Sequence, residues 1–482
     1  MLLKLFNFKT NLVHYQYIRQ IHFIGIGGSG MCGIASILVQ QGYYVTGSDI
    51  IANDTTQYLL RLGVKKIFLG HHYSNVCQAN IVVISSAIDK DNSEVQSAIR
   101  LNIPIMRRAS MLSELMRYKY SIAVSGTHGK TTTTAMLTNI YIKSGLDPTF
   151  VSGGIIKSEG VQARLGYSRY LIAEADESDK SFLCLNPIVA VVTNIDYDHM
   201  NTYDQNFDVL KESFIKFLNN LPVYGYGIVC IDDPAVRQIL FRVNKRIITY
   251  GFDKDSDVCI LNYHHVIDKS FFTLKLKNNK ELQIILNIPG RHNVLNATAA
   301  IAIAIEEGIC DSVILETMLD FAGIHRRFEN LGNYDLKNIN GRIGNITLID
   351  DYGHHPTELN ATISTIREGW SNRRLIMVFQ PHRFTRTYDL YNNFVSVLSD
   401  VDVLLILDIY SAGEESILGV DSKSLCDSVY KYGKIRPIFV SNNYVLLKIL
   451  YKLFQDNDLL LIQGAGTIGM VVRSLFTKDM RN

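Results

Sequence analysis

Three short apolar runs, each followed directly by a glycine-rich turn, stand out along the chain. They are IHFIGIGGSG from residue 21, YSIAVSGTHGK from residue 120 and LLLIQGAGTIG from residue 459. Each turn leads into a segment that is compatible with a helix. Strand, glycine loop and helix form the unit of doubly wound α/β folds, whose ligands bind at the carboxyl ends of the strands. The pattern therefore predicts several α/β domains in series.

The chain length agrees with three such domains, because 482 residues exceed the roughly 150 residues of a typical domain about threefold. We expect the first boundary between Arg107 and Lys119 and the second near the segment GIHRRFE, residues 323–329. The predicted domains are an N-terminal Rossmann-like domain (1–112), a central P-loop ATPase-type α/β domain (113–326) and a C-terminal Rossmann-like domain (327–482).

The segment between Pro222 and Gly290 has a different pattern. Strand-like pieces such as RIITYGF and FFTLKLK alternate there with polar breaks. Alternation of apolar and polar residues is typical of half-buried strands. We therefore predict an antiparallel elaboration of the middle domain.

Composition and charge narrow the class of protein. The formal net charge is +2 without a long same-sign block, so nothing favours a nucleic-acid or membrane partner. No apolar run approaches the roughly 18 residues that span a bilayer. The seven cysteines are scattered without a C-x-x-C pair, as in reduced cytoplasmic proteins. Lys4, Asn7 and Lys9 interrupt the apolar residues at the start, unlike a signal peptide.

The most specific candidate site is the loop after the strand SIAVS, Gly126-Thr127-His128-Gly129-Lys130-Thr131-Thr132. Backbone N–H groups of such a loop, with the positive end of the following helix, form a cradle for phosphate. Lys130 would neutralise the β- and γ-phosphate oxygens, and the Thr131 hydroxyl would bind Mg²⁺. The glycine expected five positions before Gly129 is Val124, so this is a compact variant of the phosphate loop.

Two later segments supply candidate metal ligands just past apolar strands. They are LIAEADESDKSF, with Glu174, Asp176, Glu177 and Asp179, and VVTNIDYDHMNTY, with Asp198 and His199. Mg²⁺ keeps several waters and takes only one or two protein ligands at a time, so most of these acids have other roles. We favour Glu174, the first acid after its strand, together with His199.

The motifs GTHGKTTT, EADESD, NIDYDHM, GRHNVLNATAA, GIHRRFE and DDYGHHPTE occur in the order and approximate spacing of the Mur ligases. The chain resembles this family, whose members add amino acids to the cytoplasmic precursor of bacterial peptidoglycan, along nearly its whole length. The resemblance implies an N-terminal UDP-substrate domain, a central ATPase domain and a C-terminal domain that closes over the site.

The resemblance also implies roles for individual residues. Catalysis would involve Lys130, His199 and Arg383, and metal binding would involve Thr131, Glu174 and His199. ATP would contact the loop from Gly126 to Thr132 and, from later motifs, His292, Asn293, Asn296, Arg326 and Asp351. Arg326 matches a hinge arginine that reaches ATP, and Asp351 an aspartate that holds the ribose. His354 and His355 remain alternatives for a general base.

The first glycine loop fits G-x-G-x-x-G, with Asp49 after a second strand. Alone this motif reads first as nicotinamide dinucleotide binding, and an oxidoreductase is the alternative from another class. A GTPase-like switch would need an N-K-x-D guanine motif, which this sequence lacks. The diphosphate of a UDP-sugar could bind to the same loop backbone and helix N-terminus as that of a dinucleotide. The resemblance assigns UDP-substrate contacts to Gly25, Gly27, Gly28, Ser29, Gly30, Met31, Asp49 and Ser86.

The segments GIGGSGM, DDYGHHPTE and QPHRFTRT resemble most the branch that joins L-alanine to UDP-N-acetylmuramate. The branch that adds a whole peptide to the same sugar nucleotide is the nearest alternative. The expected partners are thus ATP, Mg²⁺, UDP-N-acetylmuramate and L-alanine, for a cytoplasmic acid–amino-acid ligase that is a monomer or weak homodimer. Arg383 and Arg386 could clamp the alanine carboxylate or an acyl phosphate.

Overall fold

A computed structural model describes residues 18–85 and 87–469. Its strands form three sheets, one for each glycine loop of the sequence. The described chain divides into two compact units: one holds residues 18–85, 87–260, 274–282 and 295–318, and the other holds 261–273, 283–294 and 319–469. Within the described residues, no helix has the length and apolar character needed to cross a membrane.

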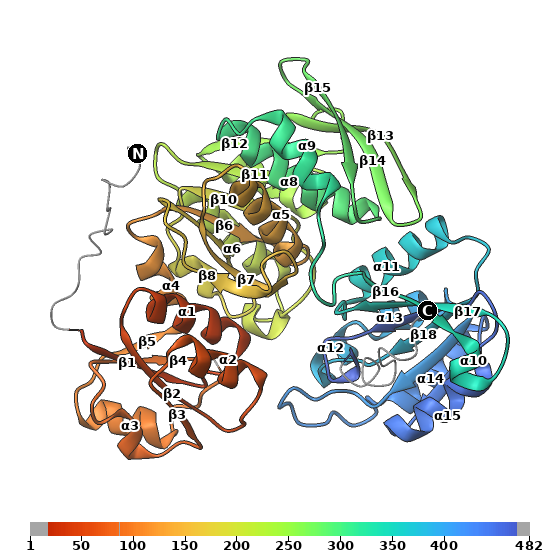
Figure 1. The fold of residues 1–482 in the computed structure, drawn as a ribbon, viewed down its shortest axis with the longest axis horizontal. Coiled ribbons are helices and arrows are strands. Elements are labelled where there is room, and N and C mark those ends of the chain that lie inside the picture. The colour runs from red at the N-terminus through yellow and green to blue at the C-terminus, as the bar shows by residue number, and fades with distance from the viewer. Residues whose placement is uncertain (1–17, 86, 470–482) are drawn as a thin grey trace, which may run out of the picture. The chain divides into compact units, whose positions relative to one another are not determined.

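The first sheet is five-stranded and parallel, in the order β3-β2-β1-β4-β5 (Figure 1). Its elements are β1 (Gln20–Ile24), α1 (Ser29–Gln40), β2 (Tyr44–Asp49), α2 (Asp54–Leu62), β3 (Lys66–Leu69), η1 (Tyr73–Val76), β4 (Ile81–Ile84), α3 (Ser93–Arg100), β5 (Ile105–Arg107) and α4 (Arg108–Met116). The strand order reverses between β1 and β4. Ligands of open α/β sheets bind at such a switch point, and the first glycine loop begins there.

Alternation along β1 builds two apolar layers on this sheet. Phe23 packs in one cluster with Ile34 of α1, whereas its neighbour Ile24 packs in another with Val95 of α3. Successive side chains of a strand point to opposite faces, so both faces are covered by helices. This burial explains the continuous apolar run in the sequence.

The second sheet has ten strands in the order β15-β14-β13-β12-β11-β10-β6-β9-β7-β8. The strands are β6 (Tyr120–Ser125), β7 (Thr149–Ile156), β8 (Val161–Arg164), β9 (Tyr170–Glu174), β10 (Val189–Val192), β11 (Tyr226–Cys230), β12 (Arg246–Gly251), β13 (Val258–Val266), β14 (Lys269–Leu276) and β15 (Glu281–Leu286). The helical elements are α5 (Lys130–Lys143), η2 (Ser181–Cys184), η3 (Met200–Tyr203), α6 (Phe207–Asn219), α7 (Pro234–Ile239), η4 (Leu240–Arg242), α8 (Arg291–Glu306) and α9 (Asp311–Leu319).

One expectation for this sheet is wrong. The segment RIITYGF contains β12, which pairs parallel with β11 and does not begin an antiparallel elaboration. The reason is helix α7, which starts after the capping residue Asp233 and forms the crossover that parallel neighbours require. The following strands β13, β14 and β15 are consecutive in the sheet, with connections of hairpin length at 267–268 and 277–280.

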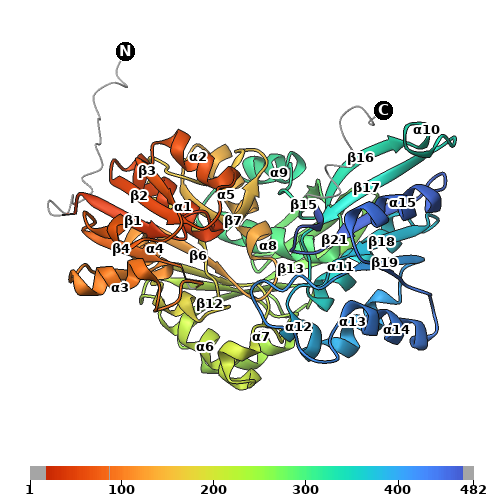
Figure 2. The ribbon, with the colours of Figure 1, turned by 90° about the horizontal axis from the view of Figure 1, so that it is seen from below.

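The third sheet has the order β16-β17-β21-β18-β19-β20, in which the edge strand β16 is antiparallel to β17 and the other pairs are parallel. Its strands are β16 (Glu329–Asp335), β17 (Asn345–Asp351), β18 (Leu375–Phe379), β19 (Val403–Leu407), β20 (Ile438–Val440) and β21 (Leu459–Gln463). The helices are α10 (Leu336–Asn340), α11 (Pro356–Gly369), α12 (Phe384–Asp389), α13 (Tyr391–Leu398), α14 (Ser422–Tyr432) and α15 (Asn443–Leu453). Figure 2 shows α13 and α14 on one face of this sheet and α15 on the other.

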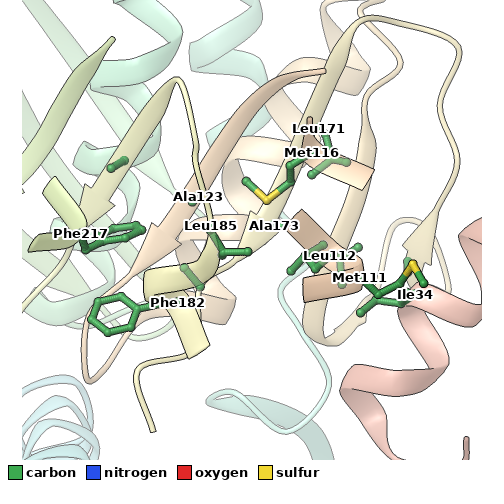
Figure 3. Close-up of a cluster of buried hydrophobic side chains, with 14 of the residues drawn as sticks. Ile34, Met111, Leu112, Met116, Ala123, Leu171, Ala173, Phe182, Leu185 and Phe217 are labelled. Carbon is green, nitrogen blue, oxygen red and sulfur yellow. The ribbon is translucent and has the colours of Figure 1, made fainter. Parts of the chain in front are cut away.

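Helix α4 joins the first two sheets through a shared hydrophobic core. Met111 and Leu112 lie beside Ile34 of α1, and Met116 lies beside Leu171 of β9 (Figure 3). All of these side chains belong to one buried cluster. The expected limit between residues 112 and 113 falls inside this helix. The first two sheets are therefore connected by packing as well as by the chain.

Candidate active site

The first glycine loop is held by the end of β2. The backbone N–H groups of Gly25 and Ile26 both donate to the carbonyl of Ser48, at 2.9 and 3.1 Å. The N–H of Gly27 donates to Oδ2 of Asp49 at 2.8 Å. Gly25 has a φ of 78°, a conformation that favours glycine. The loop is thus held in place by contacts within the protein.

Helix α1 begins at this loop without a side-chain cap on its first N–H groups, because its N-cap residue is Gly28. The N-terminal end of a helix favours anions, and uncapped N–H groups can donate to them. The expected substrate residues Gly25 to Gly30 lie together here. The side chain of Met31 is buried in the core, and its N–H donates to the Gly28 carbonyl at 3.0 Å. Ser86 lies outside the described residues.

A buried carboxylate stands behind this loop. Glu94 is fully buried and accepts hydrogen bonds from Ser48 Oγ at 2.5 Å and Asn75 Nδ2 at 2.6 Å. The rings of His22 and His71 lie 3.6 and 3.4 Å from its Oε2. Burial alone would raise the pKa of Glu94, but the bonds from His22, Ser48 and Asn75 hold this pKa below its usual value. The network connects α3 to the strand that supports the glycine loop.

The second glycine loop follows β6 and makes two close approaches that require glycine. A Cβ at Gly126 would lie 2.0 Å from Oγ1 of Thr193, and φ there is 126°. A Cβ at Gly129 would lie 2.2 Å from Oδ1 of Asn296, and φ there is 83°. Gly129 is also the N-cap of α5. Asn296, expected from a motif far along the chain, therefore contacts the phosphate loop.

Lys130 is folded into the same loop. Its Nζ donates to the carbonyls of Gly126 at 2.6 Å and Thr127 at 3.1 Å, and to Oε2 of Glu177 at 2.7 Å. Burial alone would lower the pKa of Lys130, but the carboxylates of Glu177 and Asp176 hold it above the usual value. The ammonium is therefore a charged group aimed at the centre of the loop.

The loop after β10 forms the adjacent wall. The side chain of Asn194 accepts from the backbone N–H of His128 at 2.8 Å and donates to its carbonyl at 3.0 Å. Nε2 of His128 lies 3.0 Å from Oδ2 of Asp196. Parallel pairing of β10 with β6 places Val192 opposite Ser125, so both loops leave the same edge of the sheet. This arrangement fixes the outer side of the phosphate loop.

The predicted metal ligands have suitable chemistry. In β9, Glu174 lies opposite Val124 of β6, and its Oε1 is buried without a hydrogen-bond partner among the described residues. Thr131 is in the first turn of α5 and is buried. His199 has a φ of 56°, and its Nε2 lies 3.4 Å from Oδ2 of Asp198. Carboxylate oxygens are ligands that Mg²⁺ takes, and a buried one without a hydrogen-bond partner calls for an explanation such as a bound ion.

Helix α8 carries three of the expected nucleotide contacts in its first two turns. Asn296 lies against Gly129, as described above. Asn293 is buried and donates from Nδ2 to the Pro289 carbonyl at 2.7 Å. Burial lowers the pKa of His292 to about 4, so its ring is neutral at physiological pH.

Arg326 and Asp351 lie in the second compact unit. Arg326 has a φ of 59°, and its guanidinium donates to the carbonyls of Gly464 at 2.5 Å and Gly466 at 3.4 Å. Asp351 is buried and accepts from Gly353 N–H at 2.9 Å and Thr362 Oγ1 at 2.6 Å. Burial raises its pKa. Both side chains therefore have defined partners in their own domain.

The two arginines of QPHRFTRT differ in their surroundings. Arg383 is 44% exposed, has a φ of 73°, and lies 3.6 Å from Oε1 of Glu414. Arg386 is buried, and its Nη1 donates to the carbonyl of His382 at 3.3 Å. Arg383 is thus the one more available to an anionic ligand.

Sequence reasoning did not single out Glu177, Asn194 or Glu94. Glu177 stood among four acids of EADESD, and the one signal for it was its position after a strand. Asn194 lies in NIDYDHM but is not itself an acid or a histidine. Glu94 is surrounded by four residues from three separate segments, which no local pattern indicates.

Comparisons with known proteins agree with this architecture. The family model for the Mur ligase family, catalytic domain, matches residues 20–120; the Mur ligase middle domain matches 124–304; the Mur ligase, glutamate ligase domain matches 327–466. The chain belongs to the Mur ligase family, and the predicted three-domain α/β fold is confirmed. The alternative of a nicotinamide oxidoreductase is not favoured.

Among individual relatives, the chain is 64% identical to the UDP-N-acetylmuramate–L-alanine ligase of Blochmanniella floridana, over 97% of each chain. It is similar to the crystal structure of UDP-N-acetylmuramate-alanine ligase from Thermotoga maritima, with a TM-score of 0.79, 29% identity, and 94% and 97% of the two chains covered. A murein peptide ligase from Psychrobacter arcticus shares the fold at 24% identity and a TM-score of 0.70, over 95% and 98% of the chains.

Proposed function

We propose that this protein is an ATP-dependent ligase that joins L-alanine to the lactyl carboxylate of UDP-N-acetylmuramate, in cytoplasmic synthesis of the peptidoglycan precursor. The observation that carries the proposal is the pair of glycine loops on connected sheets, one suited to a diphosphate and one to ATP. The 64% identity to a ligase of that name over 97% of the chain supports the choice of substrates.

The chemistry begins with two anions that must meet. The substrate carboxylate attacks the γ-phosphorus of ATP, the bond between that phosphorus and the β–γ bridging oxygen breaks, and ADP leaves as an acyl phosphate forms. Lys130, pointing into the phosphate loop, offsets the repulsion between carboxylate and phosphate and stabilises charge on the transferring group. We assign Gly126 to Thr132 and Asn296 to the phosphates on the same grounds.

The amine of alanine then attacks the acyl carbon, and inorganic phosphate leaves as the amide bond forms. We propose that Arg383 orients the amino acid through its carboxylate, because this arginine is the more exposed of the two in its motif. An acyl phosphate is hydrolysed in bulk water, so the site must exclude water during this step. Arg326 and Asp351 are proposed to contact the nucleotide from the C-terminal domain.

Mg²⁺ fits the residues of the middle domain. Thr131, Glu174 and His199 would hold it, and the unpaired oxygen of Glu174 supports this set. When bound, the metal supplies neutralisation of phosphate charge. We propose the monomer or a weak homodimer as the working form.

The test is a phosphate-release assay with purified protein, ATP, Mg²⁺ and UDP-N-acetylmuramate. We expect release to depend on added L-alanine. Dependence on a peptide instead of alanine would identify the peptide-adding branch. Oxidation or reduction of a nicotinamide without phosphate release would contradict the proposal altogether.

A further inference from the structure

Arg108 lies directly against the first glycine loop, although nothing in the sequence connects the two. A Cβ placed on Gly30 would lie 3.0 Å from Cδ, 3.1 Å from Nη1 and 3.3 Å from Nε of Arg108. The arginine side chain therefore crosses the first turn of α1 at the distance of direct contact. Gly30 provides the space that this approach needs.

The base of Arg108 is rigid. It is the first residue of α4, and the helix is fixed by Ala109, Met111 and Leu112, all of which are buried. Met111 and Leu112 belong to the core that the first two sheets share (Figure 3). A side chain on so fixed a helix turn loses less freedom on binding a ligand than one on a mobile loop.

The guanidinium also has a partner from the second domain. Its Nη2 lies 3.2 Å from Oδ2 of Asp176, and the arginine side chain is still 19% exposed. Asp176 in turn is near enough to Lys130 to act on its charge. Arg108 is thus oriented by one carboxylate while the rest of its fork remains accessible.

We propose that Arg108 binds the diphosphate of the UDP-sugar, opposite the N-terminal end of α1. The proposal rests on the proposed function, because it requires a UDP substrate at the first loop. The backbone N–H groups of the uncapped helix end supply donors from one side, and Arg108 supplies a cation across the same turn. A planar guanidinium can donate two parallel hydrogen bonds to phosphate oxygens. It also carries a positive charge, which backbone N–H groups do not.

The experiment compares UDP with uridine as ligands of the full chain, by calorimetry or competition. Arg108→Gln, which keeps much of the stem length, should weaken UDP binding at least tenfold. The affinity for uridine, which lacks the diphosphate, should change less than twofold. The UDP affinity of Arg108→Lys should lie between those of the wild type and Arg108→Gln, because lysine keeps the positive charge but lacks the planar guanidinium.

Arg107→Gln is the matched control, since the neighbouring Arg107 is exposed and should leave both affinities unchanged. Equal losses of UDP and uridine affinity would show that Arg108 only supports the fold, and would overturn the proposal. So would an effect confined to UDP-N-acetylmuramate with UDP unchanged, because the cation would then serve the sugar carboxylate. If the wild type itself binds no UDP, the proposed function fails, and not the role of Arg108 alone.

Discussion

Nζ of Lys130 lies 2.7 Å from Oε2 of Glu177, and only 3% of that glutamate side chain is exposed. The same ammonium donates to two carbonyls of the loop that surrounds it. A charged donor with three fixed acceptors has a defined direction. Lys130 is therefore held by the protein in one orientation within the proposed phosphate loop.

Lys130→Ala should keep the fold and lose turnover, because it removes the cation that stabilises the transferring phosphoryl group. The measurement is phosphate release with saturating L-alanine. A variant that keeps more than about a tenth of the wild-type rate, or ~1.4 kcal/mol of barrier, would refute the phosphate-loop assignment. Lys143→Ala, at the other end of α5 and paired with the exposed Glu316, is the matched control and should keep its rate.

Gly27→Val should weaken UDP-N-acetylmuramate binding strongly while the affinity for an ATP analogue stays nearly unchanged. A Cβ at this position would lie 2.9 Å from Oδ2 of Asp49 and 3.1 Å from Cγ2 of Thr56, so the loop must shift away from the diphosphate. Titration calorimetry with each nucleotide checks both halves of the prediction. Saturable NAD binding to the wild type that no UDP-sugar displaces would count against it.

Glu94→Gln should destabilise the protein at neutral pH and lose that effect in acid. The folded-state pKa of Glu94 lies below the usual value, so its contribution is present above the unfolded pKa and is lost as pH falls through the folded one. We expect the substitution to lower the free energy of unfolding by about 1–3 kcal/mol at pH 7. Denaturant unfolding from pH 7 down to about pH 3, below the usual glutamate pKa of 4.5, measures the loss, with Glu316→Gln as an exposed control. A difference that stays constant with pH would contradict this explanation.

Cys310 should react first with a thiol reagent at pH 8. Hydrogen bonds from the hydroxyl and the backbone N–H of Ser312 lower its pKa, whereas burial raises the pKa of Cys32 to about 11. The thiolate is the reactive species. Ser312→Ala should slow labelling of Cys310, and Cys310→Ser should remove the fast phase. A fast phase that survives in Cys310→Ser would assign it to another cysteine.

The parts of the fold that were predictable are those coded by local pattern. The strands at β1, β6 and β21 end where an apolar run meets a glycine, because the buried strand and the tight turn each leave a signal within ten residues. The direction of β12 was not predictable in this way. It depends on whether the chain crosses over through a helix, and helix α7 is only six residues long.

The same limit applies to the site. Lys130 and Thr131 were visible because a phosphate loop is contiguous in sequence. Arg108 and Asp176 are 68 residues apart, and Asn194 holds a loop residue 66 positions earlier. The Asn194 contact arises because β10 and β6 are parallel neighbours whose ends lie at one edge of a sheet, whereas Arg108 and Asp176 follow strands of two different sheets. Asp49 was expected to contact substrate, and its bond to Gly27 shows a supporting role that spacing does not reveal.

Helix α4, with Met111, Leu112 and Met116 in a core common to two sheets, bears on how such proteins can exchange parts. An N-terminal segment taken from a relative would supply only one side of this core, and the middle domain of the recipient chain would have to pack against it. Cutting at the apparent border would expose apolar side chains on both pieces. Recombination between family members should therefore succeed when the crossover point lies beyond the second sheet, and fail when it lies within α4.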